Sequence, residues 1–180
     1  MEKQITLEET YKTETRSKKI LNVYQDDAIV NNSKYLYNVT LGPCVSVVLC
    51  GIDNLNEIWF GVNHMFKSRE ENTDIALQHV ADLYHKLMDN NIEKIKCLGV
   101  FGAHYKKDSF IKDVATKNIM TILEALSLFD LPIELYQTGF SQNISFYKSN
   151  SLNSILLKHF NINDKETSII EIALDNFFEP

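Results

Sequence analysis

Two stretches of the sequence repeat their apolar residues with the period of a long α-helix, and nearly all other apolar runs are short. Between Thr73 and Asn90 the apolar side chains recur at spacings of four and three, with a helix-starting threonine and a helix-ending asparagine at the two ends. A second face of this kind runs from Val114 to Phe129 and ends before Pro132. The pattern predicts two amphipathic helices in a chain that otherwise consists of strands.

The remaining apolar runs have the length and the β-branched or aromatic content of strands. The expected strands are 20–23, 28–30, 35–39, 45–49, 58–62, 95–101, 133–136, 144–147 and 154–157. Only one strand-helix step is followed by another before the closing run of strands, which favours mixed or antiparallel pairing. We therefore predict an α/β fold: a single-domain layered α-β sandwich with mixed or antiparallel strands and two long helices.

The chain has the size of one globular domain, with 180 residues of which 44% are hydrophobic. Residues 1–19 are rich in Thr, Glu and Lys, and we expect them to form a polar N-terminal arm that is loose or adds to a sheet edge. The domain proper is expected at 20–160. Residues 161–180 form a C-terminal tail whose apolar residues suit either a strand or a short helix, and the tail is a candidate docking segment.

Charge and hydropathy argue against several classes of partner. The chain has 18 basic and 24 acidic residues, so a net charge of -6 offers no basic patch that would hold nucleic acid. The first 19 residues contain no apolar signal region, and no segment has the run of roughly 18 apolar residues that a membrane span requires. We expect a cytoplasmic protein with no nucleic-acid partner and no membrane insertion.

Common cofactor and metal motifs are missing from the sequence. No G-x-G-x-x-G follows the first strands, and no G-x-x-x-x-G-K-[ST] occurs. The cysteines Cys44, Cys50 and Cys97 are an odd number for a reducing compartment, and their spacings do not place two metal ligands on one turn. We therefore expect free thiols, no metal and no cofactor.

Cys44 differs from the other two cysteines because it follows Gly42-Pro43 and precedes a buried-strand pattern. A nucleophilic cysteine needs a base, and His64 stands 20 residues later, just beyond the expected strand 58–62. The ordinary alternatives are a packed core thiol for Cys44 and a hydrogen-bonded histidine for His64, and spacing alone favours them. His159 and the two histidines expected on the first helix are interpreted as solvated residues.

The segments LGPCVSV (41–47) and GVNHMF (61–66) together resemble the paired signature of the CheD family of chemoreceptor glutamine deamidases. The similarity continues in order through VFGA (100–103), ATKNIMTILEALSLFDLPI (115–133) and TGFSQNISFYKSNSLNSILLK (138–158). It covers about residues 20–160, an extent consistent with one domain. Pro43, Gly99 and Ala103 depart from the residues usual in the family.

The resemblance implies the family's layered α/β sandwich, with Cys44 as nucleophile and His64 as its base. The implied reaction is hydrolysis of a glutamine side-chain amide in the cytoplasmic helical domain of a chemoreceptor, through a cysteine thioester, which makes the protein a protein-glutamine glutaminase. A CheC-like phosphatase is a further implied partner. The tight turn before Cys44 is expected to present the thiol at an exposed strand edge.

In the family, a threonine shortly before the cysteine orients the histidine ring, and this sequence offers two candidates. The family spacing falls on Asn38, whereas the nearest threonine is Thr40. Side chains alternate along a strand, so both should lie on one face, from which either is expected to reach His64. Thr40 is slightly favoured because it keeps the hydroxyl group of the family's threonine. The alternative is that both residues are ordinary strand residues with cross-strand partners.

Two other functions stay open on the sequence. The departures at Gly99 and Ala103 motivate a catalytically weak CheD-like binding module that regulates a CheC-type phosphatase. A cysteine hydrolase acting on small amides or esters is a weaker third reading.

Overall fold

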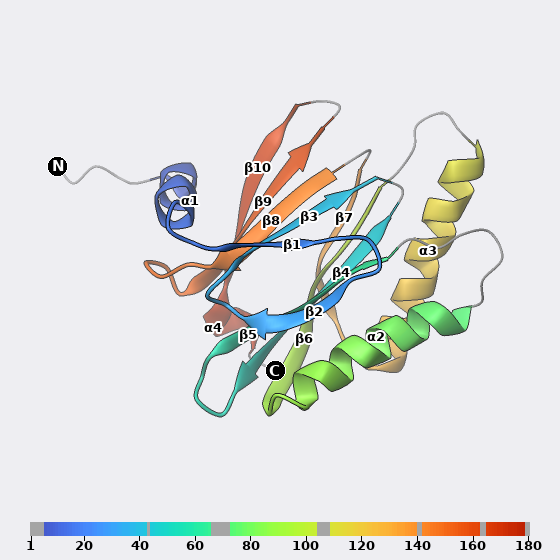
Figure 1. Ribbon diagram of the computed structural model, residues 1–180, viewed down its shortest axis with the longest axis horizontal. Coiled ribbons are helices and arrows are strands. Elements are labelled where there is room, and N and C mark those ends of the chain that lie inside the picture. Colours follow the sequence, from blue (N-terminus) through green and yellow to red (C-terminus); the bar gives the residue numbers. More distant parts are fainter. Residues whose placement is uncertain are drawn as a thin grey trace.

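The computed structural model describes residues 6–42, 44–65, 73–103, 109–139, 142–162 and 165–178. Its strands form two five-stranded sheets that pack face to face, with helices on the outer sides (Figure 1). This architecture confirms the predicted single-domain α/β sandwich with mixed strand directions. None of the helices in these ranges combines the length and apolar character that a membrane span requires.

The first sheet, sheet A, combines two early strands with the last three strands of the described chain. Its members in spatial order are β1 (Ile20–Val23), β3 (Leu36–Leu41), β8 (Gln142–Lys148), β9 (Ser154–Asn161) and β10 (Thr167–Ala173). The first two strands pair in parallel, and the other neighbours are antiparallel. The sequence left open whether the C-terminal tail forms a strand or a short helix. Part of it forms the strand β10, which completes the sheet as an edge strand.

The second sheet, sheet B, contains the strands that surround the cysteine and histidine candidates. Its members in spatial order are β2 (Ala28–Asn32), β5 (Ile58–Met65), β4 (Val45–Asp53), β6 (Ile92–Ala103) and β7 (Ile133–Gly139). Only β6 and β7 pair in parallel. The central strand β4 is buried along its first seven residues, as its continuous β-branched run predicted.

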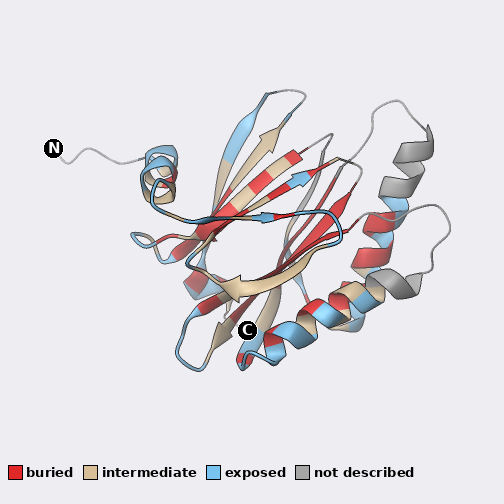
Figure 2. Cartoon of the chain, viewed as in Figure 1, coloured by how far each residue is buried: buried red, intermediate tan, exposed pale blue. Residues whose placement is uncertain are grey.

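Helices α2 (Thr73–Met88) and α3 (Ser109–Leu128) cover the outer face of sheet B. Buried residues alternate with exposed ones along residues 77–88 of α2 (Figure 2), as expected for an amphipathic helix. The glycine at position 61 lets this helix approach closely, because a Cβ there would lie 3.1 Å from carbon atoms of both Leu83 and Leu87. Both predicted helices are confirmed, although α3 begins five residues before Val114.

The space between the sheets holds the main apolar core. Tyr37, Phe60 and Phe146 form an aromatic cluster there, with ring centroids 5.1 to 5.3 Å apart. These rings come from strands of both sheets, so the cluster fixes the two layers against each other.

The N-terminal segment forms a helix, not the loose or edge-forming arm that we expected. Helix α1 (Leu7–Thr15) begins at Thr6, which forms a capping box with Glu9. Its one buried residue, Tyr11, packs edge-on against Tyr147 on the outer face of sheet A, with ring centroids 5.4 Å apart. At the other terminus the short helix α4 (Leu174–Phe177) follows β10, so the tail contains both a strand and a helix.

Candidate functional site

Strands β4 and β5 bring Cys44 and His64 to the same end and the same face of sheet B. In the antiparallel register Ser46 lies opposite His64, and Val45 lies opposite Met65. Cys44 directly precedes this ladder and belongs to the core between the sheets. It is therefore a diagonal neighbour of the histidine, a relation in which Cα atoms lie about 7–8 Å apart. No hydrogen bond joins Cys44 to Nε2 of His64 among the described residues, so contact between them would require a side-chain rotation or a bridging water molecule.

Both residues are more enclosed than the sequence predicted. Cys44 and His64 each have only 6% of their surface exposed. We expected an exposed turn thiol and a histidine beyond the end of its strand. The histidine instead lies inside β5, because pairing with β2 and β4 continues beyond residue 62. Pro43, at the centre of the expected turn, is outside the described residues.

His64 is held by the last residue of β1 and by the turn that connects β1 and β2. Its Nδ1 lies 3.2 Å from the carbonyl oxygen of Val23, and its main chain exchanges hydrogen bonds with Asp26 and Asp27 at 2.7 and 3.1 Å. A hydrogen bond to a carbonyl requires the proton on Nδ1, which leaves the lone pair on Nε2. Nε2 is buried and has no hydrogen-bond partner among the described residues. The tautomer that this contact favours therefore leaves Nε2 available as a hydrogen-bond or proton acceptor.

The electrostatic surroundings keep the Cys44 thiol protonated at rest. Burial raises the pKa of this thiol, a backbone hydrogen bond with Gly42 opposes the effect, and the negative charge of Asp26 adds to it. A protonated thiol is a weak nucleophile, so Cys44 depends on a base to become reactive. His64 Nε2 is the nearby group with the required lone pair.

The other two thiols have the properties of packed core residues. All three cysteines are free, as the sequence predicted. Complete burial raises the pKa of Cys50 well above its usual value, and burial raises the pKa of Cys97 to about 12. Neither thiol lies at a strand end, so both are expected to be chemically inert.

The two candidates for orienting the histidine lie on the face of sheet A that points away from sheet B. Inward-facing side chains of β3 alternate with Asn38 and Thr40, so these two residues share one face, but that face points away from sheet B. Asn38 donates a hydrogen bond to Asn22 at 2.9 Å, and Thr40 is exposed. The structure therefore brings neither residue to His64. The carbonyl oxygen of Val23 takes the acceptor position instead.

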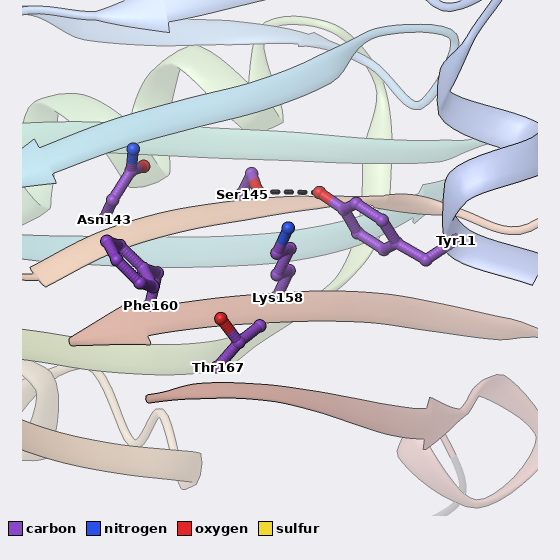
Figure 3. Close-up of a pocket in the computed structure, with 6 residues that line it drawn as sticks. All are labelled: Tyr11, Asn143, Ser145, Lys158, Phe160 and Thr167. Carbon is purple, nitrogen blue, oxygen red and sulfur yellow. Dashed lines mark hydrogen bonds between the residues drawn. The ribbon is translucent and has the colours of Figure 1, made fainter. Parts of the chain in front are cut away.

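The outer face that carries these two residues has its own shallow hollow of about 340 Å³ (Figure 3). Its lining residues are Tyr11, Asn143, Ser145, Lys158, Phe160 and Thr167. The Tyr11 and Ser145 hydroxyls are hydrogen-bonded at 2.6 Å, which ties α1 to the sheet. In the strand register Asn38 pairs with Ser145 and Thr40 pairs with Asn143, so both residues border this hollow and not the thiol.

A polar bridge that the sequence analysis missed connects the two sheets beside Cys44. Gln142 of β8 is fully buried, and its amide donates to the carbonyl oxygen of Gly102 on β6 at 2.7 Å. Its amide oxygen lies 3.1 Å from Nε2 of His159, which donates to it. Gly102 is paired with Val45, the residue after the thiol. His159 was expected to be solvated, but β9 directs it inward, where burial lowers its pKa. His104, which follows the VFGA segment at the end of an expected strand, is outside the described residues.

The comparisons with known proteins assign no family to this arrangement. No protein-family model matches the chain, and no curated protein matches it. In the described parts of the chain, no three or more His, Cys, Asp and Glu side chains are grouped so that they could hold a metal ion. Among the described residues, this end of the sandwich contains the Cys44 thiol, the His64 imidazole and the bridge formed by Gln142 and His159.

Proposed function

We propose that this protein is a chemoreceptor glutamine deamidase of bacterial chemotaxis, a cytoplasmic amidohydrolase with a cysteine nucleophile. One observation carries the proposal: Cys44 and His64 share a face at adjacent strand ends, and the Val23 carbonyl leaves Nε2 of the histidine free. The order of the LGPCVSV and GVNHMF segments adds to it, since those segments resemble the CheD family and contain these two residues.

The reaction begins with proton transfer from the Cys44 thiol to Nε2 of His64. The sulfur attacks the side-chain carbonyl carbon of a receptor glutamine and forms a tetrahedral adduct. Backbone N–H groups at the start of β4, including that of Cys44, stabilise the oxyanion, whereas Pro43 has no N–H to contribute. The imidazolium then protonates the departing nitrogen, and ammonia leaves as the γ-glutamyl thioester forms.

Hydrolysis of the thioester completes the cycle. His64 removes a proton from water, and the resulting hydroxide attacks the thioester carbonyl. The carbon-sulfur bond breaks, glutamate is released and the thiol recovers its proton. The Val23 carbonyl supports both halves, because a hydrogen bond at Nδ1 stabilises the imidazolium that forms each time.

The enclosure of the thiol limits which amides can reach it. Glutamine carries its carboxamide on a flexible chain of two methylene groups, which suits a recessed nucleophile. The proposed partner is the cytoplasmic helical domain of a chemoreceptor, where such side chains project from helix surfaces. The deamidated product carries a new carboxylate at each reacted position.

The test incubates the full chain with a purified receptor cytoplasmic fragment and follows its peptides by mass spectrometry. The proposal predicts a glutamine-to-glutamate mass change at specific sites with wild-type protein. Cys44→Ala should produce none while remaining folded, and Cys50→Ala is the matched control that should retain activity. Conversion by Cys44→Ala at the wild-type rate would refute the mechanism.

The burial of Cys44 and its raised pKa favour one alternative, a CheD-like module that binds and regulates a CheC-type phosphatase without deamidating receptors. The same assay separates the two functions. A receptor fragment that stays unmodified, together with complex formation between the chain and a CheC-type phosphatase, would establish the binding module.

A further inference from the structure

We infer that the end of the sandwich opposite Cys44 binds a small amphipathic anion, with an apolar body and a carboxylate or phosphate head. A cavity of about 420 Å³ lies there, with walls from both sheets and from the C-terminal tail. Ile52, near the last residue of β4, lines it, whereas Cys44 precedes the first residue of this nine-residue strand. At about 3.3 Å per residue the two places are more than about 20 Å apart. The inference therefore does not depend on the proposed enzymatic activity.

The inner wall of this far-end cavity is apolar because it is the edge of the core between the sheets. Ile58 and Leu174 are core residues with exposed fractions of 3% and 7%, and Ile52 and Phe178 pack against the same core. A ligand with an apolar body would extend this packing and remove the exposed edge from water. A fully hydrated solute such as a free sugar would gain nothing from such a wall.

The rim of the cavity carries two lysines from opposite sheets. Lys94 belongs to β6 of sheet B and Lys148 to β8 of sheet A, and neither forms an ion pair with any described residue. Burial lowers the pKa of the nearby Lys18, the Glu14 carboxylate opposes this effect, and the positive charge of Lys148 adds to it. Two unpaired ammonium groups above an apolar wall favour an oxyanion head between them.

The acidic group in the lining forms no ion pair with either of these lysines. Asp175 is the one acidic residue among those that line the cavity, and its carboxylate accepts a hydrogen bond from the Asn153 amide at 2.6 Å. The Asn153 carbonyl in turn accepts from the Leu174 N–H at 2.9 Å. These bonds hold α4 in place as one side of the cavity. The C-terminal tail, a candidate docking segment in the sequence, thus contributes a wall of a small-molecule site.

Octanoate is a suitable probe because it combines an apolar body with a carboxylate head. Titration of the full chain with octanoate, followed by calorimetry and by amide chemical shifts, should show one saturable site with shifts around Ile58 and Leu174. Acetate, which has the head alone, and octanol, which has the body alone, should bind at least about tenfold more weakly. Equal affinity for acetate and octanoate would overturn the inference, since the apolar wall would then play no part.

Matched lysine variants test the head contacts. The double variant Lys94→Met/Lys148→Met keeps the apolar stems and should weaken octanoate binding at least about tenfold, because two charge-assisted contacts are lost. Lys34→Met, at an exposed lysine outside the cavity, should bind like the wild type. Thermal unfolding without ligand shows whether the double variant is folded. Wild-type affinity in a folded double variant, or no saturable octanoate binding by the wild type, would refute the site.

Discussion

The two ends of the sandwich are built from the same strands but differ in whether a titratable side chain is buried. At the β4 start, polar atoms are buried and one of them, His64 Nε2, lacks a partner among the described residues. At the β4 end, the charged groups stand at the rim, where water solvates them, and the one acidic lining group is already hydrogen-bonded. Burying a polar atom without a partner costs free energy, whereas lysine charges at a solvated rim cost little. This contrast motivates the proposed chemistry at the first end and the proposed reversible binding at the second.

The largest effect should follow the loss of the imidazole. His64→Ala should lower the turnover of receptor glutamine by roughly 10²–10⁴, the usual contribution of a general base. It should also slow alkylation of Cys44 by iodoacetamide near neutral pH, because the thiol loses its proton acceptor. His85→Ala, at an exposed histidine of α2, is the matched control. Unchanged turnover and alkylation in His64→Ala would remove the distinction between the two ends.

The buried bridge at the first end should contribute more to the free energy of unfolding than the exposed hydrogen bond at the second. Gln142→Leu removes the contacts with Gly102 and His159 and should lower the free energy of unfolding by about 1–3 kcal/mol. Asn153→Leu removes an exposed hydrogen bond to Asp175 and should change the free energy of unfolding by no more than about 0.5 kcal/mol. Urea denaturation of both variants measures the difference. Equal losses would mean that burial does not separate the two ends.

The parts of this molecule that could be predicted from sequence are those with a local signal. The β-branched run of β4 and the two long apolar helix faces produced the elements they predicted. Helix α1 was missed although Thr6 and Glu9 are a recognisable start signal, because the composition of the segment was given more weight than its capping box. The exact ends of elements were less accurate, since pairing partners extended β5 through His64.

The site was harder to predict because its geometry depends on which face of each strand meets the other sheet. Alternation correctly placed Asn38 and Thr40 on one face, but only the packing of β3 against sheet B decides that this face points outward. The same limit hid the contact between Gln142 and His159, which requires the register of β8 and β9. No local pattern indicates that a backbone carbonyl, that of Val23, holds the histidine ring.

A smaller effect is expected from the charge on the turn above the thiol. Asp26 raises the pKa of Cys44, although burial contributes more. Asp26→Asn should therefore lower this pKa modestly and increase the thiolate fraction at each pH below it. Alkylation of Cys44 followed against pH should show its midpoint displaced toward lower pH, with the fold unchanged because the Asp26 side chain is exposed. A displacement toward higher pH would contradict the placement of the carboxylate near the sulfur.

The smallest effect is expected at the two residues that the sequence suggested for orienting the histidine ring. Thr40→Val and Asn38→Leu alter the outer face of sheet A, and neither side chain is on the side of the sheet that faces His64. Both variants should therefore retain receptor turnover within about twofold, although Asn38→Leu should lose a few tenths of a kcal/mol of stability with its exposed hydrogen bond to Asn22.

Turnover and urea denaturation, measured on the same preparations, separate a catalytic loss from unfolding. A folded Thr40→Val protein with a large loss of turnover would mean that its hydroxyl reaches the imidazole during catalysis, which requires β3 to rotate its polar face inward. Because that rotation would expose Val39 and Leu41, which are now buried, retained turnover is the outcome that the packing favours.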